Sequence, residues 1–269
     1  MYAFDADRRL TRVEPGRYAG GISARWDIGT IPNGGFVLAL GLGAVQEEAP
    51  GLAPLTVTGH YLRPFGHGAL EVAVERIKEG KRFSTFAARM LQGGREHLRL
   101  LATFGQLDLP GAPRWQDLAP PEISTAGEVR IAESRLPAPP MTQNFEVVID
   151  AETGGWLRGD PPSLRADGTP SRAELSGRIR FADGRAPDLA SLSLFADAVP
   201  PPALVVARAG WVPTLELTVH HRAVPVPGWL RFVFRTHLVQ GGYLEEDGEL
   251  WDEAGTLVAM SRQLALSPT

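Results

Sequence analysis

The chain has 269 residues, of which 43% are hydrophobic and 22% charged, a composition typical of globular domains and not of disordered chains. Its formal net charge of −4 and its pI near 5.9 argue against a nucleic-acid partner, because such partners normally bind a basic surface. The absence of cysteine excludes disulfides, cysteine zinc sites and a thiol nucleophile.

The first residues carry no basic segment followed by an apolar core, so we expect no secretory signal. The longest apolar run, 36–45, spans about ten residues and is too short to cross a bilayer. We therefore expect a soluble, cytoplasmic protein with no membrane partner.

Two stretches, 108–140 and 154–170, are rich in proline, glycine and small polar residues. Proline at this density fits neither a helix interior nor a sheet, so both stretches are predicted to be loops. The first divides the chain into two comparable parts. We predict an N-terminal domain over 1–108, a linker over 109–138 and a C-terminal domain over 139–269.

In the N-terminal part, residues 18–26 alternate loosely and are predicted to form a strand. Residues 34–48 are apolar at nearly every position after an Asn-Gly-Gly turn, which predicts a helix buried on all sides. Four further strands with alternating or β-rich patterns are expected at 55–62, 70–78, 83–92 and 96–106.

The C-terminal part repeats this order. Strands are expected at 144–150 and 178–182, followed by a helix over 188–199. Asp188 is a plausible N-cap of that helix, and three consecutive prolines from Pro200 would end it. Four more strands are expected at 214–221, 229–238, 241–252 and 257–266.

The two parts can be superposed in sequence with an offset of about 160 residues, and they share one order of elements. A strand, a central apolar helix and four strands, repeated twice, predict an α+β fold of two antiparallel sheets, each wrapped round a central helix. This is the double hotdog plan, fused in one chain. Sheet edges left over by the fusion also predict a homodimer of chains.

Several motifs resemble the TesB-like acyl-CoA thioesterases. In the N-terminal part these are NGGFVLAL at 33–40, LTVTGHYLRP at 55–64 and ATF at 102–104; in the C-terminal part they are FAD at 195–197, TLELTVHHR at 214–222 and GTLVAMSRQ at 255–263. The resemblance implies a double hotdog hydrolase of lipid metabolism, which splits acyl-CoA into free acid and coenzyme A and needs no cofactor.

The resemblance also implies a catalytic set that holds and activates one water. Carried onto this chain, the set is Asp197, Thr214 and Gln263, with Thr218, expected on the same face of the same strand, as the substitute for Thr214. The structural alternatives are ordinary: Asp197 can cap the end of its helix, and Gln263 can point outward from a terminal strand.

Asn33, Gly34 and Gly35 open the first helix, where free N–H groups and the helix dipole could polarise a bound carbonyl. Alternatively, the glycines only let the chain turn closely onto the sheet. The six histidines show no metal-ligand spacing, so no metal is expected. Basic residues that could meet coenzyme A phosphates, or could be ordinary solvated surface, are Arg63, Lys81, Arg82 and Arg222.

Two other functions fit a hotdog pair. A hydratase or dehydratase of this fold presents an aspartate and a histidine five residues apart, whereas the residue five positions after Asp197 is Pro202. A non-catalytic module that binds acyl thioesters remains the second alternative, and the presence of Asp197 and Gln263 discriminates against it only weakly.

Overall fold

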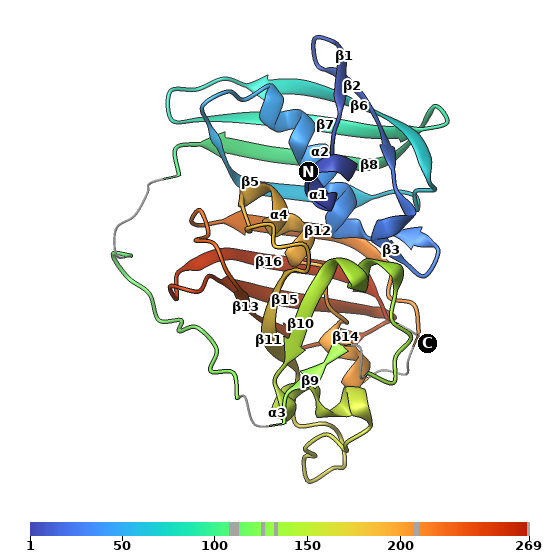
Figure 1. Ribbon diagram of the computed structural model, residues 1–269, viewed down its shortest axis with the longest axis vertical. Helices are drawn as coiled ribbons and strands as arrows, with labels where there is room; N and C mark the ends of the chain where they lie inside the picture. Colours follow the sequence, from blue (N-terminus) through green and yellow to red (C-terminus); the bar gives the residue numbers. More distant parts are fainter. Residues whose placement is uncertain (108–112, 125–126, 132–133, 207–209, 268–269) are drawn as a thin grey trace.

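The computed structural model describes the chain except for residues 108–112, 125–126, 132–133, 207–209 and 268–269. It confirms the double hotdog. Each half consists of an antiparallel sheet with a helix against it, and the two halves lie one above the other (Figure 1). No helix in the described part of the chain is long and apolar enough to cross a membrane.

The N-terminal half is built round α2, Gly34–Glu47, whose side chains are buried over most of its length. Its sheet comprises β1 Thr11–Glu14, β2 Arg17–Ile22, β6 Gly68–Lys78, β7 Phe83–Gln92, β8 Arg95–Gly105 and β5 Ala53–Tyr61, in that spatial order. The strand expected at 18–26 stops at Ile22, because the chain turns into a short 3-10 helix, Ala24–Trp26, which buries Trp26. A small hairpin, β3 Asp27–Ile28 and β4 Ile31–Pro32, leads into α2.

The C-terminal half is built round a shorter helix, α4, Leu189–Phe195. Asp188 forms the expected N-cap, but the helix ends four residues before the expected position. The sheet continues through β12 Thr214–His221, β16 Leu257–Leu266, β15 Tyr243–Trp251, β13 Leu230–Thr236, β11 Ala173–Phe181, β10 Phe145–Ile149 and β9 Val129–Arg130, and β14 Val239–Gln240 pairs with β15.

The stretches predicted to be loops, and the segments next to the predicted helices and strands, contain short regular elements. β9 lies inside the predicted linker and pairs with β10, and the 3-10 helix Pro140–Asn144 follows it. A short helix, α3 Ala151–Gly154, runs into the 3-10 helix Gly155–Arg158, and a further 3-10 helix spans Pro202–Val205. Pattern alone could not reveal these one-turn pieces, because they lack a repeating apolar face.

The two sheets are joined edge to edge through β5 and β12, which pair in antiparallel register with Thr58 opposite Thr218. The result is one continuous sheet in place of two open edges. Both strands of the junction have a register irregularity at corresponding places, Pro54/Thr56 in β5 and Thr214/Glu216 in β12. Inside, α2 packs against α4.

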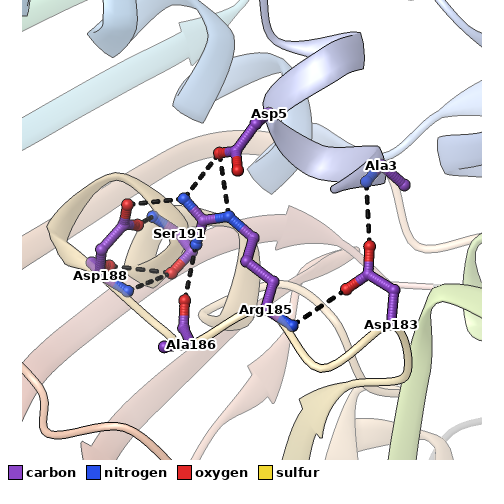
Figure 2. Close-up of polar contacts among 7 residues, drawn as sticks. All are labelled: Ala3, Asp5, Asp183, Arg185, Ala186, Asp188 and Ser191. Atoms are coloured by element: carbon purple, nitrogen blue, oxygen red, sulfur yellow. Dashed lines mark hydrogen bonds and ion pairs between the residues drawn. The ribbon is translucent and has the colours of Figure 1, made fainter. Parts of the chain in front are cut away.

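The N-terminal helix α1, Ala3–Asp7, fastens the start of the chain to the C-terminal half (Figure 2). The guanidinium of Arg185 donates to Asp5 Oδ1 at 2.9 and 2.8 Å and to Asp188 Oδ2 at 2.6 Å, and the amide of Ala3 donates to Asp183 Oδ2 at 2.9 Å. Phe4 is fully buried beside Phe181, with ring centroids 5.5 Å apart. The chain terminus therefore contributes to the contact between the halves.

Candidate active site

Asp197 lies just beyond α4, on a turn that follows the C-cap Ala196 and precedes the three prolines. One of its carboxylate oxygens, Oδ2, accepts from Asn33 Nδ2 at 2.9 Å and from the backbone N–H of Gly35 at 2.8 Å. Asn33 Nδ2 also donates to the Asp197 carbonyl at 2.7 Å. The carboxylate is therefore held by residues of the other half of the molecule.

Asn33 links the start of α2 to this contact. Its Oδ1 accepts from the N–H of Phe36 at 2.8 Å, so the same side chain caps the helix and binds Asp197. A Cβ on Gly35 would lie 2.6 Å from the Ser193 carbonyl oxygen, and a Cβ on Gly34 would lie 3.1 Å from Asp197 Oδ2. Both glycines therefore allow the two helices to approach, and that approach is what brings Asp197 to the α2 N-terminus.

Burial raises the pKa of Asp197 from its ordinary value of 3.8 to about 6, although the hydrogen bonds from Gly35 and Asn33 act in the opposite direction. A carboxylate with this pKa is ionised at neutral pH and is a far better proton acceptor than a solvated aspartate. The position suits a general base.

Gln263 and Thr214 come together from neighbouring strands of the C-terminal sheet. Gln263 Nε2 donates to Thr214 Oγ1 at 2.9 Å, while Gln263 Oε1 is buried and has no partner among the described residues. Gln263 lies opposite Leu217 of β12 and opposite Glu246 of β15. The Gln263 side chain is thus fixed on the inner face of the sheet, with one acceptor oxygen still free.

Thr218 occupies the other face of β12. Its Oγ1 shares a hydrogen bond of 2.8 Å with Thr58 Oγ1 across the junction and also contacts the Glu216 carboxylate. The expectation that Thr214 and Thr218 share a face is wrong, because the irregularity between Thr214 and Glu216 shifts the alternation of side chains. Thr218 is not among the described residues that line the cavity.

Asp197, Thr214, Gln263 and Gly34 line one cavity of ≈ 710 Å³. Its walls are mainly apolar and come from both halves; they include Ile28, Val37, Phe65, Leu136, Val199 and Trp211. A cavity of this size accommodates an acyl chain, and the polar residues form one patch on an apolar wall.

Two residues that pattern did not single out also line this cavity. Tyr61 donates its hydroxyl to the Gly34 carbonyl at 2.9 Å, and burial raises its pKa well above 10, so it stays a neutral donor. Glu246 on β15 is only 7% exposed. A signal for Glu246 was present in the sequence, since Leu244, Glu246 and Leu250 alternate onto the buried face of their strand.

Of the basic residues proposed for phosphate contact, only Arg63 lines the cavity, and it also donates to the Glu96 carbonyl at 2.7 Å. Lys81, Arg82 and Arg222 are exposed and lie outside the described lining. No group of three or more acidic or histidine side chains in the described part of the chain is placed to hold a metal ion.

Comparison with known proteins agrees with this architecture. Residues 22–105 match the family described as "Acyl-CoA thioesterase N-terminal domain", and residues 112–267 match "Acyl-CoA thioesterase C-terminal domain". An uncharacterized protein of Mycobacterium tuberculosis (strain ATCC 25618 / H37Rv) is 29% identical over 268 residues, which cover 93% of this chain and 91% of the relative.

Solved structures give the same result. A candidate thioesterase II from Thermobifida fusca YX is similar with a TM-score of 0.87 and 29% identity, covering 100% of this chain and 98% of its own. A conserved protein with a hot dog fold from Alicyclobacillus acidocaldarius has a TM-score of 0.84 at 22% identity, covering 100% and 99%, and shows the likeness of the fold. The chain therefore belongs to the acyl-CoA thioesterase family, whose TesB-like members its motifs resemble.

Proposed function

We propose that this protein hydrolyses acyl-CoA thioesters to free acid and coenzyme A, with Asp197 as the general base for an attacking water. The observation that carries the proposal is the meeting of Asp197, Thr214 and Gln263 at one apolar cavity. These residues come from a turn and two strands, and no local folding rule requires them to meet.

In this mechanism a water donates one hydrogen to the Asp197 carboxylate and the other to the free Gln263 Oε1. Because Gln263 Nε2 donates to Thr214 Oγ1, the Thr214 hydroxyl hydrogen remains available to the water or to the thioester carbonyl. As the water oxygen adds to the carbonyl carbon, its proton passes to Asp197. Collapse of the tetrahedral intermediate releases the thiolate of coenzyme A, and that thiolate takes up the proton.

The contacts of Asn33 and Gly35 with Asp197 support a positioning role for the α2 N-terminus. They hold one carboxylate oxygen, which leaves the other for the water. A hydratase mechanism is less well supported, because no histidine is among the described residues that line the cavity.

The test is thiol release from a panel of saturated acyl-CoAs by the wild-type protein and by Asp197→Asn. The substitution keeps the side-chain volume and removes the base, so we expect kcat/KM to fall by roughly 100-fold or more. Circular dichroism and thermal melting would check that the variant is folded.

Three results would contradict the proposal. Tight acyl-CoA binding without thiol release would indicate a binding module. Conversion of an enoyl-CoA without free thiol would indicate hydration, and a folded Asp197→Asn protein with near-normal hydrolysis would remove Asp197 from the mechanism.

We further propose that the enzyme acts in lipid metabolism in the cytoplasm. We also propose that two chains form a homodimer, and that each chain has domains over 1–108 and 139–269. Light scattering over a broad concentration range tests the assembly, and a particle of only 29 kDa throughout would exclude the homodimer.

A further inference from the structure

Tyr61 is a cavity residue that has no step of its own in the proposed mechanism. It stands at the end of β5, and its hydroxyl donates to the Gly34 carbonyl, in the first turn of α2, at 2.9 Å. The ring also packs against Gly34, because a Cβ added to that glycine would lie 3.2 Å from two ring atoms. Tyr61 therefore fastens the start of α2 to the N-terminal sheet.

The first turn of α2 needs this support more than the rest of the helix does. Gly34 and Gly35 are consecutive, and glycine disfavours a helix because its backbone loses the most freedom on folding. Neither glycine has a side chain that could hold the turn by packing. Both are nevertheless required, since they let α2 approach α4. The contact between the helices therefore places flexible residues where the site has to be rigid.

The same turn carries the donors that hold the proposed base. The backbone N–H of Gly35 and the side chain of Asn33 donate to Asp197 Oδ2, at 2.8 and 2.9 Å. Gly34 links these two donors in the chain, so a bond to its carbonyl restrains both of them. A carbonyl oxygen has two lone pairs, and the Tyr61 hydroxyl can therefore bind it without competing with the backbone bonds of the helix.

A second tyrosine fastens the other end of α2. Tyr18 on β2 is 2% exposed and donates its hydroxyl to Oε1 of Glu48, the C-cap of the helix, at 2.6 Å. Tyr61 is among the described residues that line the cavity, and Tyr18 is not. The two tyrosines give the same kind of support at opposite ends of one helix, but only Tyr61 supports the end that contacts Asp197.

We propose that Tyr61 is a positioning residue for thioester hydrolysis, which acts on Asp197 through the first turn of α2. Its hydroxyl holds the Gly34 carbonyl, and the turn then keeps its two donors directed at the carboxylate. Burial raises the pKa of Tyr61 well above 10, so the hydroxyl remains a donor at neutral pH. The inference rests on the proposed function and adds a residue to its machinery.

Loss of the hydroxyl should change the ionisation of Asp197. Burial raises the pKa of this carboxyl to about 6, while the hydrogen bonds from Gly35 and Asn33 lower it. A looser turn weakens both bonds, so the pKa should rise further in Tyr61→Phe. Titratable groups that interact with Asp197 are Tyr61 on β5 and Glu246 on β15. Because Glu246 is unchanged in the variant, it does not affect the comparison.

The test is the pH profile of thiol release from a saturated acyl-CoA by Tyr61→Phe, which keeps the ring and removes only the hydroxyl. We expect kcat at about pH 8 to fall about three- to tenfold, with KM changed less than about twofold, because the base is misplaced and the apolar cavity is intact. The midpoint of the acid limb of kcat/KM should rise by about half a pH unit. The deficit relative to the wild type should therefore grow about twofold between pH 8 and pH 6.

Tyr18→Phe is the matched control, because it removes the hydroxyl bond at the other end of α2. Both variants lose one hydrogen bond and should melt at a lower temperature than the wild type. Only Tyr61→Phe should move the acid limb, whereas Tyr18→Phe should keep the wild-type midpoint and a kcat within about twofold of the wild-type value. A purely structural role of Tyr61 would make the two variants alike.

A second readout does not depend on catalysis. The difference in Tm between a protein and its Asp197→Asn variant falls as the pH rises through the pKa of Asp197. In the Tyr61→Phe background this fall should occur about half a pH unit higher than in the wild-type background.

The outcomes separate this inference from the proposed function. An unchanged acid limb and an unchanged Tm range in Tyr61→Phe would overturn the role of Tyr61 and leave thioester hydrolysis standing. An equal loss of activity in Tyr18→Phe, with the same profile, would likewise overturn it. Thiol release by none of the proteins would contradict the proposed function itself, while the Tm measurements would still decide whether Tyr61 acts on Asp197.

Discussion

The two halves of the molecule have corresponding positions that can be identified from the sheet registers. Thr58 and Thr218 face each other at the junction, so a local two-fold axis relates the halves there. The strand pairing on either side of these residues gives three equivalent pairs of positions. Pro54 corresponds to Thr214, Ala102 corresponds to Gln263, and Phe86 corresponds to Glu246.

These positions are apolar and packed in one half, and polar and open to the cavity in the other. Phe86 and Ala102 are each 1% exposed, and the Phe86 ring packs edge-on against Phe104 with centroids 5.7 Å apart. The helices differ in the same way, because α2 has 14 residues and α4 has 7. The early end of α4 releases Asp197 from the helix and leaves room over its sheet, while the longer α2 fills its own half.

The test with the largest expected effect introduces a glutamate at Phe86, the position in the N-terminal half that corresponds to Glu246. Phe86→Glu places a carboxyl group among closely packed apolar side chains, so we expect a loss of about 4 kcal/mol in the free energy of unfolding. Urea denaturation measures it. Phe83→Glu on the same strand, at a residue that is 40% exposed, should change stability by less than about 0.5 kcal/mol. A Phe86→Glu protein as stable as this control would show that the N-terminal half is not packed as described.

The second test weakens the attachment of the chain terminus to the C-terminal half. The Arg185 side chain is 7% exposed and binds Asp5 and Asp188, as Figure 2 shows. Arg185→Met leaves two partly exposed carboxylates without their cation, and should cost about 2 kcal/mol in the free energy of unfolding. Arg262→Met, which breaks an ion pair at a side chain that is 67% exposed, should cost at most about 0.5 kcal/mol. Equal effects of the two substitutions would contradict the role given to this contact.

The third test titrates the C-terminal site. Asp197 must be ionised to act as a base, and its pKa is raised to about 6, so kcat/KM should fall about tenfold between pH 7 and pH 5. Because the folded-state pKa exceeds the ordinary 3.8, the contribution of this carboxyl to stability is present below about pH 4 and is lost as the pH rises through about 6. The Tm of the wild type relative to Asp197→Asn should therefore fall over that range. A pH-independent difference in Tm would place Asp197 in a solvated environment.

Much of the fold could be predicted from the sequence because its signals are periodic. The all-apolar run of α2 and the alternation in β7, β12 and β16 gave the type of each element and nearly its ends. The end of α4 was harder, because residues 196–199 remain helix-compatible in composition and the turn that contains Asp197 is stabilised by contacts with Asn33 and Gly35 more than 160 positions away.

The candidate site was only partly predictable for related reasons. The position of Thr214 depends on an irregularity in β12 that composition does not reveal, so the sequence alone does not distinguish Thr214 from Thr218. Glu246 lies in the acidic run from Glu245 to Glu249, which is typical of a solvated strand, although its alternation already placed it on the buried face. Side-chain burial, and not residue type, separates it from its neighbours.

The junction of β5 with β12 has a consequence for protein synthesis. About 150 residues separate the end of β5 from the start of β12, so the ribosome needs roughly 8–30 s at roughly 5–20 residues per second to supply the strand that covers β5. During that interval the nascent N-terminal half has an unpaired edge strand, which can pair with the same strand of a neighbouring nascent chain. Polysomes translating this message would bring several such edges close together, and the delay before β12 emerges sets how long each one stays open.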